Sequence, residues 1–340
     1  MPIEKTDLEK TKLQIGYIPL LDCVALLWAK HRGFFSDYGL DVHLVKEASW
    51  ASLRDRLAFG FLDAAHCLSA MLPAAALGTD QLGIVFKSPL VLSENQAFIS
   101  LSQKLCFQLD ISAQDSAQQS AQKIIHAIQQ GENIQFAHVF KHSIHHYCLR
   151  EWLALADETH AYQINLTALP PPYMVDAMSK HLIDGFCVGE PWNSQAEIEG
   201  YSHIIASGQS IIPKVADKVL AMTTEWIQQH PHTSVAMTIA IQQAQDELKT
   251  LSESDFKAVW QLLIEYDIIH FPCSAERHVQ KFYFIQNIIK NFVGDDGQPK
   301  ASDFVWLIEK MMKWDQLDIK ISKAQIDVIG QNCIHPHTVR

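Results

Sequence analysis

The sequence predicts an α/β protein with two lobes, and three observations support this prediction. Short apolar strand patterns alternate with helix patterns between residues 13 and 189, an order that is typical of an open, mostly parallel sheet. A polar, glutamine-rich stretch at 103–134 separates a first series of these patterns from a second series. The length of 340 residues is sufficient for two compact lobes.

The first series predicts strands and helices in strict alternation. In order, they are a strand at 13–19, a helix at 22–33, a strand at 41–47, a helix from 49 to 59, a strand at 61–68 and a helix at 71–78. Ser49 is suited to capping the second helix, and Gly78 is suited to ending the third. Because ligands of such sheets bind where a strand leads into a helix, the candidate binding loops are 18–22, 47–50 and 67–71.

The second series follows the glutamine-rich stretch, which is expected to be a surface loop that leads into an amphipathic helix. Its predicted elements are a strand at 136–140, a helix at 143–156, a strand at 164–169, a helix after the proline run at 170–172 and a strand at 183–189. From about residue 235 onward, apolar residues recur at three- and four-residue spacing. This spacing predicts helices that cover a sheet.

The composition excludes several classes of protein. Thirty-eight acidic and 27 basic side chains give a net charge of −11, and 48% of the residues are hydrophobic, which excludes a disordered or fibrous chain. The acidic balance argues against tight contact with nucleic acid or an anionic membrane. The first twelve residues contain no apolar run, so no export signal is expected, and the apolar stretches are too short for a membrane span.

Motifs for catalysis and for metal binding are absent from the sequence. There is no G-x-S-x-G, no glycine-rich loop with a Walker lysine, no G-x-G-x-x-G after a strand and no H-E-x-x-H, so we expect a binding protein without a cofactor rather than an enzyme. Seven scattered cysteines without a C-x-x-C pair favour reduced, buried thiols.

Three histidines provide one alternative to this view. His142, His145 and His146 share a helical face at metal-ligand spacing, but no carboxylate or cysteine lies nearby in sequence to complete a coordination shell. The other interpretation is one ligand-facing histidine and two that are solvated or capping.

Four segments resemble a known family. They are K-E-A-S-W (46–50), F-K-H-S-I-H-H-Y (140–147), P-P-P-Y-M (170–174) and G-F-C-V-G-E-P-W-N (185–193). Between residues 13 and 230 the sequence is similar to the nitrate-binding members of the nitrate/bicarbonate substrate-binding proteins of ABC transporters. The resemblance implies a type II periplasmic-binding-protein fold, in which two crossovers join two α/β lobes around a ligand cleft. Lobe I would comprise 1–97 and 208–340, and lobe II would comprise 98–207.

The lack of an export signal makes the sequence resemble the NasS-type cytoplasmic nitrate/nitrite sensors of this family. Such a sensor would release a NasT-like RNA-binding antiterminator protein when it binds its anion. The alternative is the nitrate receptor of an ABC transporter, with an export segment outside this sequence. A third interpretation, a relative of the pyridoxal-phosphate-dependent pyrimidine synthase of thiamine biosynthesis, lacks support because the cysteine-rich CCCFC segment is absent.

The resemblance implies six ligand-binding residues: Trp50, Gln96, His145, Pro171, Gly189 and Lys218. Nitrate is a planar monoanion and a weak hydrogen-bond acceptor, so its site requires a cation, several N–H donors and enclosed surroundings. Lys218 would supply the cation, and Trp50 and His145 would supply N–H donors. Gly189 would let the backbone approach the ligand.

The remaining residues of the site have more general roles. Gln96 would contribute a side-chain amide, and Pro171 would stiffen the facing loop. Glu190 is expected to pair with a basic group or the hinge, because a glutamate beside an anion is repulsive. Lys218 is expected to have no acidic partner, unlike the carboxylate-and-calcium arrangement of bicarbonate relatives.

Each candidate also has a purely structural interpretation. Trp50 also suits a core position, and Lys218 also suits a solvated one. Ser49 suits a simple N-cap, and Gln96 suits a hinge loop. Four further residues are expected to cap helices or hold strand ends: Asp63, His66, Asp176 and Asp184.

Overall fold

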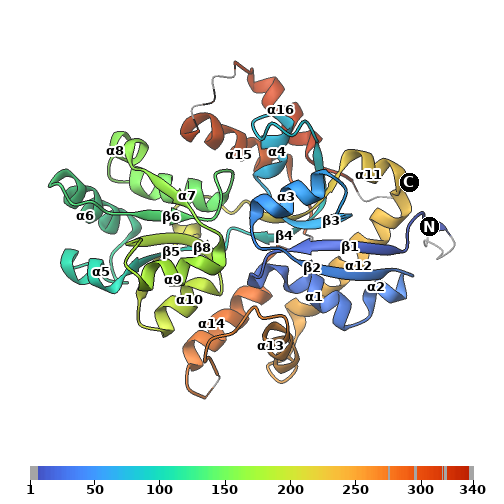
Figure 1. Cartoon of the computed structure of the whole chain (residues 1–340), viewed down its shortest axis with the longest axis horizontal. Coiled ribbons are helices and arrows are strands. Elements are labelled where there is room, and N and C mark those ends of the chain that lie inside the picture. Colours follow the sequence, from blue (N-terminus) through green and yellow to red (C-terminus); the bar gives the residue numbers. More distant parts are fainter. Residues whose placement is uncertain (1–6, 275, 295–296, 316, 318–319, 337–340) are drawn as a thin grey trace.

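The computed structural model describes residues 7–274, 276–294, 297–315, 317 and 320–336, and its strands form two five-stranded sheets (Figure 1). The orders are β2-β1-β3-β10-β4 and β7-β6-β8-β5-β9. In each sheet, two of the pairings are parallel and two are antiparallel. The predicted α/β class is therefore confirmed, but the expectation of mostly parallel sheets is wrong.

The first sheet and its helices form what we call lobe I. Its strands are β1 (Lys12–Tyr17), β2 (Asp41–Lys46), β3 (Ala64–Leu68), β4 (Phe86–Glu94) and β10 (Ala216–Thr223). The helices between them are η2 (Leu21–Cys23), α1 (Val24–His31), α2 (Phe34–Asp37), α3 (Trp50–Ala58) and α4 (Met71–Ala76). Ser49 caps α3 as predicted, because its hydroxyl accepts a hydrogen bond from Ser52 N at 3.2 Å.

The second sheet and its helices form lobe II. Its strands are β5 (Ala97–Ser102), β6 (Phe136–His138), β7 (Leu166–Ala168), β8 (Gly185–Gly189) and β9 (Ser202–Ser207). The helices are α5 (Gln103–Leu109), α6 (Ala117–Gln129), α7 (Ile144–Ala154), α8 (Glu158–Gln163), η3 (Pro171–Tyr173), α9 (Met174–Ser179) and α10 (Trp192–Ile198). The amphipathic helix predicted in the glutamine-rich stretch is α6, with a capping box of Ser116 and Gln119. α5 occupies the first part of the loop expected before this helix, and residues 110–116 form the rest of it.

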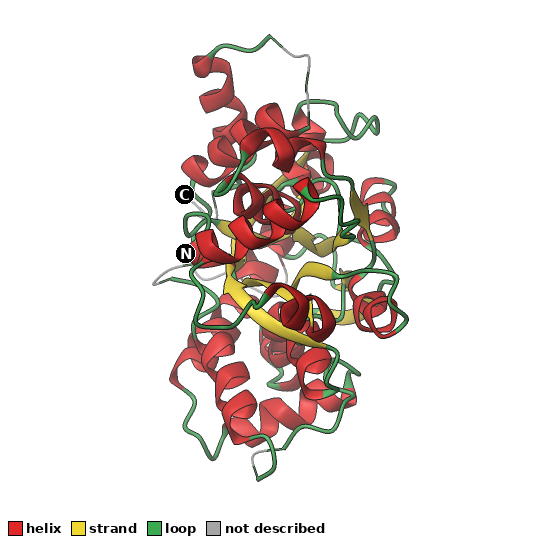
Figure 2. Cartoon of the chain, turned by 90° about the vertical axis from the view of Figure 1, so that its left-hand side faces the viewer, coloured by secondary structure: helices red, strands yellow, loops and turns green. Residues whose placement is uncertain are grey.

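The chain passes between the sheets twice. It leaves the first sheet after β4 and enters the second at β5, and it returns between β9 and β10 through η4 (Gly208–Ser210). Figure 2 shows the strands inside the molecule and the helices around them. The limits 1–97 with 208–340 and 98–207 stay predictions of the resemblance.

Helices predominate after β10, as the spacing predicts. They are α11 (Thr224–Gln229), α12 (Pro231–Thr250), α13 (Phe256–Glu265), α14 (Val279–Lys290), α15 (Ala301–Trp314) and α16 (Lys323–Asn332). α12 packs against α1 and α2 of lobe I. α14 and α15 reach lobe II from opposite sides of the junction between the sheets (Figure 1): Lys281 of α14 forms an ion pair with Glu197 of α10, and Lys310 of α15 forms one with Glu151 of α7.

Candidate functional site

Lys218 is a completely buried lysine at the junction of the two lobes. Its side chain is 0% exposed, and its ammonium lies 2.8 Å from Asp217 Oδ1 and 3.2 Å from Asp22 Oδ2. The ammonium also lies 5.8 Å from the centre of the Trp50 ring. Lysines are almost never buried to this degree without a partner, so the two carboxylates account for its position.

A β-bulge brings Asp217 and Lys218 to the same place. Consecutive residues of a regular strand point to opposite faces of the sheet. In β10, however, the pairing advances from Ala216 to Lys218 while β4 moves by only one residue, from Glu94 to Ser93. The extra residue turns the strand locally, and both side chains therefore reach the same cluster.

Asp22 holds the lysine from the segment that follows β1. Its Oδ1 lies 2.8 Å from His66 Nε2 on β3, and its Oδ2 accepts a hydrogen bond from Ser93 Oγ at 3.3 Å. Both oxygens of the Asp22 carboxylate thus have protein partners, and Oδ2 also forms the ion pair with Lys218.

Lobe II supplies His145 and Gly189. His145 lies in the first turn of α7, and its Nε2 is 4.0 Å from Asp217 Oδ2. Gly189 ends β8, and a Cβ at this position would lie 3.8 Å from both His145 Nε2 and Asp22 Oδ2. The site is therefore built from both lobes. We call its members the central cluster: Asp22, Trp50, His66, Ser93, His145, Gly189, Asp217 and Lys218.

Several polar atoms of the central cluster are buried without a hydrogen bond. Within the described part of the chain, Trp50 Nε1 and both ring nitrogens of His145 lack a hydrogen-bond partner. The ammonium of Lys218 is also without one, although it lies close to two carboxylates. Buried donors are nearly always paired in proteins, so these groups have the chemistry to hold a small hydrogen-bond acceptor.

The charges of the central cluster are set by burial and by mutual pairing. Burial alone would lower the pKa of the Lys218 ammonium, but the carboxylates of Asp217 and Asp22 outweigh it and raise that pKa. Burial likewise opposes ionisation of Asp22, yet Lys218 and His66 hold its pKa below the usual range. Burial raises the pKa of Asp217, and Lys218 offsets this only in part. Burial, with Lys218 as the next cause, lowers the pKa of His145 well below its usual value, so the imidazole is neutral.

The structure brings together four of the six residues expected to bind the ligand: Trp50, His145, Gly189 and Lys218. Gln96 lies elsewhere, because its Nε2 donates a hydrogen bond to the carbonyl of Asn291 at 3.2 Å. Pro171 is buried at the start of η3, where its carbonyl accepts from Met174 N.

Sequence reasoning did not identify Asp22, Ser93 and Asp217 as part of the site. The expectation that Lys218 has no acidic partner is wrong, since two carboxylates pair with it. His66 was expected to hold a strand end, but it contacts Asp22 inside the cluster. A usable signal existed for Asp22 alone, which lies in the candidate loop 18–22.

The three aspartates expected to cap helices or hold strand ends make different contacts. Asp63 and Asp184 hold strand ends as predicted, by accepting hydrogen bonds from Gln14 N and Gln135 N at 2.8 and 2.9 Å. Asp176 instead forms an ion pair with Lys180 on an exposed face.

Glu190 belongs to the contact between the lobes. It was expected to pair with a basic group or the hinge, but its Oε2 accepts a hydrogen bond from Ser194 N at 3.0 Å, in the first turn of α10. Burial raises the pKa of Glu190 to about 7. Its carbonyl accepts from Leu21 N at 2.8 Å, and Trp192 Nε1 donates to Pro19 O at 3.2 Å. Two hydrogen bonds beside Asp22 thus join the lobes.

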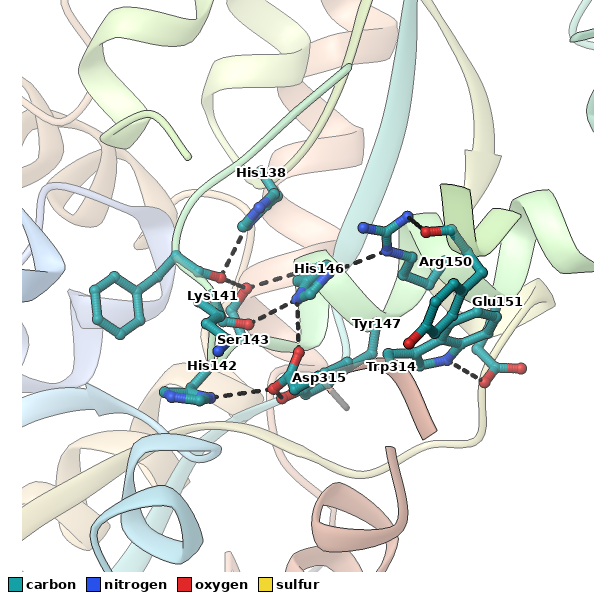
Figure 3. Close-up of polar contacts among 12 residues, drawn as sticks. His138, Lys141, His142, Ser143, His146, Tyr147, Arg150, Glu151, Trp314 and Asp315 are labelled. Atoms are coloured by element: carbon teal, nitrogen blue, oxygen red, sulfur yellow. Dashed lines mark hydrogen bonds and ion pairs between the residues drawn. The ribbon is translucent and has the colours of Figure 1, made fainter. Parts of the chain in front are cut away.

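His142, just before α7, and His146, in its first turn, face Asp315, directly after α15 (Figure 3). The carboxylate of Asp315 lies 3.4 Å from His142 Nδ1 and 3.7 Å from His146 Nδ1, and it accepts a hydrogen bond from Tyr147 OH at 3.1 Å. His142 and His146 are buried, so the interpretation of them as solvated is wrong. His146 Nδ1 also lies 2.8 Å from the carbonyl of Lys141, so this nitrogen carries the proton.

Three further observations describe the chemistry available to the protein. Among the described residues, no group of three or more His, Cys, Asp or Glu side chains has an arrangement that could hold a metal ion. None of the described helices combines the length and the apolar character that a membrane crossing requires. All seven cysteines are free thiols, as predicted, and all except Cys273 are buried.

The two lobes have the fold of the periplasmic-binding proteins, and the central cluster lies at their junction. A crystal structure of the periplasmic nitrate-binding protein NrtA from Synechocystis superposes with a TM-score of 0.81 and 23% identity, over 96% of this chain and 86% of that one. The alkanesulfonate-binding protein SsuA from Xanthomonas axonopodis superposes with a TM-score of 0.68 and 16% identity, over 93% and 98% of the two chains.

The chain belongs to the NMT1-like family, whose model matches residues 6–263. It is 30% identical to the nitrate/nitrite binding protein NrtA of Nostoc over 95% of this chain and 74% of the relative. It is 31% identical to the bicarbonate transport ATP-binding protein CmpC of Synechocystis over 97% of this chain but 50% of the relative. The chain thus spans about half the length of this relative. These similarities confirm the resemblance to the nitrate/bicarbonate substrate-binding proteins of ABC transporters.

Proposed function

We propose that the protein binds nitrate or nitrite between its lobes and serves as the receptor of a nitrate-type ABC transporter. The observation that carries this proposal is the buried Lys218 ammonium, together with the unpartnered N–H groups of Trp50 and His145. A cation with converging N–H donors in buried surroundings is the arrangement that a small, weakly accepting anion requires. The similarity to proteins named for nitrate binding supports the same ligand.

The charge of the central cluster limits which anions it can accept. Lys218 neutralises one carboxylate, and a second carboxylate remains. A monoanion about 4 Å from an ionised carboxylate is repelled by about 4 kcal/mol at an effective dielectric constant of about 20. We therefore expect singly charged nitrate or nitrite to bind, and doubly charged sulfate to be excluded.

Calorimetric titration with nitrate, nitrite, bicarbonate and sulfate tests the ligand class. Micromolar binding of nitrate, which corresponds to about −8 kcal/mol, is the expected result. Trp50→Phe keeps an aromatic ring but removes the indole donor, so affinity should fall about tenfold. Trp226→Phe is the matched control, because the indole of Trp226 donates its hydrogen bond to Asp63 within lobe I, outside the central cluster. Tighter binding of bicarbonate than of nitrate would contradict the proposal.

A second proposal is a cytoplasmic nitrate/nitrite sensor that releases a NasT-like RNA-binding antiterminator protein. It is supported by the origin of the central cluster in both lobes, because a ligand held by both lobes favours one relative orientation over others. A partner that binds the other orientation would then be released without any covalent step.

Size-exclusion chromatography separates the two proposals. A sensor should form a complex with the antiterminator in ligand-free buffer and lose it when millimolar nitrate is added. By reciprocity, the partner should weaken nitrate binding by the same factor. A transporter receptor should bind nitrate and show no such complex.

A further inference from the structure

Asp217 is one of two carboxyl groups beside Lys218 in the central cluster, and a site for an anion does not by itself require a second one. Its Oδ1 is buried, and within the described residues it has no hydrogen-bond partner, although Lys218 Nζ lies 2.8 Å away. Its Oδ2 faces His145 Nε2 at 4.0 Å. The carboxyl group therefore lies beside the same lysine and histidine that are proposed to hold the anion.

Several titratable groups from both lobes lie around Asp217. They are Lys218 on the same strand, Asp22 in η2, His66 on β3, His145 on α7, and the thiols of Cys187 on β8 and Cys148 on α7. Lys218 is the positive charge of this set, and Asp22 already pairs with it from the other side. Asp22 is fully hydrogen-bonded, whereas Asp217 is not.

Nitrate is the anion of a strong acid and brings no proton into the site. An ionised Asp217 could only accept hydrogen bonds, and it would face another group that only accepts them. A protonated carboxyl group is a donor and carries no charge, so it removes the repulsion and adds a hydrogen bond. The β-bulge that turns Asp217 toward Lys218 then serves ligand binding as well as the ion pair.

We propose that Asp217 is a further ligand-facing residue, which enters the anion complex as a protonated carboxyl group and donates a hydrogen bond to the anion. This inference rests on the proposed binding of nitrate or nitrite. It makes binding proton-linked: each anion that enters the site is accompanied by a proton on Asp217. Burial, which raises the pKa of Asp217 in the free protein, favours the same protonated form.

The direction of the pH dependence follows from this linkage. A bound anion raises the pKa of Asp217 further, so binding takes up a proton wherever the free protein has lost it. Affinity for nitrate should therefore be constant below the pKa of free Asp217 and fall by up to about tenfold per pH unit above it. Lys218, whose pKa is raised, stays charged between pH 6 and 9.

The experiment is calorimetric titration of the full chain with sodium nitrate between pH 6 and 9, in buffers of different ionisation enthalpy. The dependence of the apparent enthalpy on the buffer gives the number of protons taken up. Wild type should take up as much as one proton per nitrate at the high end of this range. Asp217→Asn has the shape of the protonated acid and an amide donor, so it should bind nitrate with no proton uptake and with nearly constant affinity.

Asp303→Asn is the matched control. Asp303 is a second buried carboxyl group with a raised pKa, and it accepts a hydrogen bond from Ala216 N, the residue before Asp217. It lies outside the central cluster, so this variant should keep the proton uptake of wild type.

Three outcomes would overturn the inference. Nitrate binding by wild type without proton uptake and with constant affinity from pH 6 to 9 would refute it and leave the proposed function intact. Unchanged proton uptake in Asp217→Asn would place the proton on another group. No binding of nitrate or nitrite at any pH would overturn the proposed function and the inference with it.

Discussion

At the residue scale, the two ends of β8 carry glycines that differ in the space around them: Gly189 has room for a methyl group, and Gly185 does not. A Cβ on Gly189 would meet Leu20, Asp22 and His145 at 3.6–3.8 Å, which is ordinary contact. Gly189→Ala should therefore leave the free energy of unfolding within about 1 kcal/mol of wild type. The added methyl group fills space beside the central cluster, so nitrate affinity should fall at least about tenfold by calorimetry.

Gly185→Ala is the control for this variant on the same strand. A Cβ on Gly185 would lie 2.7 Å from Leu101 Cδ2 and 2.8 Å from the ring of Phe136, far from the cluster residues. This variant should lose about 1–3 kcal/mol of stability through overpacking. A Gly189→Ala protein with unchanged affinity would show that the ligand does not approach this position.

Glu190 gives a prediction on stability against pH. Burial raises the pKa of Glu190 to about 7 from a usual 4.5. Between these two pH values, the native state therefore keeps a proton on Glu190 that the unfolded state releases. The stability that this proton contributes is present below pH 4.5 and is lost as the pH rises to 7. Glu190→Gln should therefore be more stable than wild type at pH 8, by up to about 3 kcal/mol, and similar at pH 4.5.

Urea unfolding at these two pH values measures the difference. Glu199→Gln is the control, since Glu199 is exposed at the other end of α10. An equal gain in both variants would assign the effect to the net charge rather than to burial of Glu190.

At the element scale, the contact between α7 and α15 depends on the carboxylate of Asp315 and the hydroxyl of Tyr147, 3.1 Å apart (Figure 3). Each group is buried where the helices meet, so removing one leaves the other without its partner. Asp315→Ala and Tyr147→Phe should each cost about 1–3 kcal/mol. The double variant should cost less than their sum by about 1 kcal/mol or more.

Unfolding of the four proteins of this double-mutant cycle gives the coupling. Additive costs would mean that the two helices are held by other contacts, such as the ion pair between Lys310 and Glu151.

Helices and strands that are specified by local patterns were predicted from the sequence, whereas strands that depend on distant partners were not. Strand–helix–strand units such as β1-α1-β2 and β6-α7-β7 were predicted, because their apolar patterns and capping residues are local. The strands β4, β5, β9 and β10 were not predicted. β10 pairs with β3, which precedes it by more than a hundred residues, and no local pattern specifies such an antiparallel partner.

The same reasoning applies to the site. Lys218, Trp50 and His145 were found through their segments' resemblance to a family. Asp217 was not, because its position depends on a one-residue bulge against β4, which the sequence of β10 alone does not indicate. The resemblance also implied Gln96, whose side chain donates a hydrogen bond to the carbonyl of Asn291, just after α14, rather than to the central cluster.

At the scale of the whole molecule, the central cluster adjoins the contacts that hold the two lobes together. Asp22 lies in the central cluster. The residues just before it are hydrogen-bonded to lobe II: Leu21 N donates to the carbonyl of Glu190, and Pro19 O accepts from Trp192 Nε1. α14 and α15 add contacts on either side of this junction (Figure 1). We call the arrangement of the lobes in this structure, with Lys218 and His145 both near Asp217, the closed arrangement. A ligand that contacts both residues at once should bind this arrangement more tightly than one in which they are separated, and should therefore increase its population.

Trp192 provides the test of this coupling, because it joins the lobes without belonging to the central cluster. Trp192→Phe keeps the aromatic ring but removes the hydrogen bond to Pro19 O, which is worth about 1 kcal/mol. The closed state should lose that much, so nitrate affinity should fall about fivefold, and small-angle scattering should show a more extended ligand-free protein. Trp226→Phe removes an equivalent hydrogen bond, to Asp63 within lobe I, so it should lower stability and leave affinity unchanged. Equal affinity losses in the two variants would mean that the indole of Trp192 contributes to general stability rather than to lobe closure.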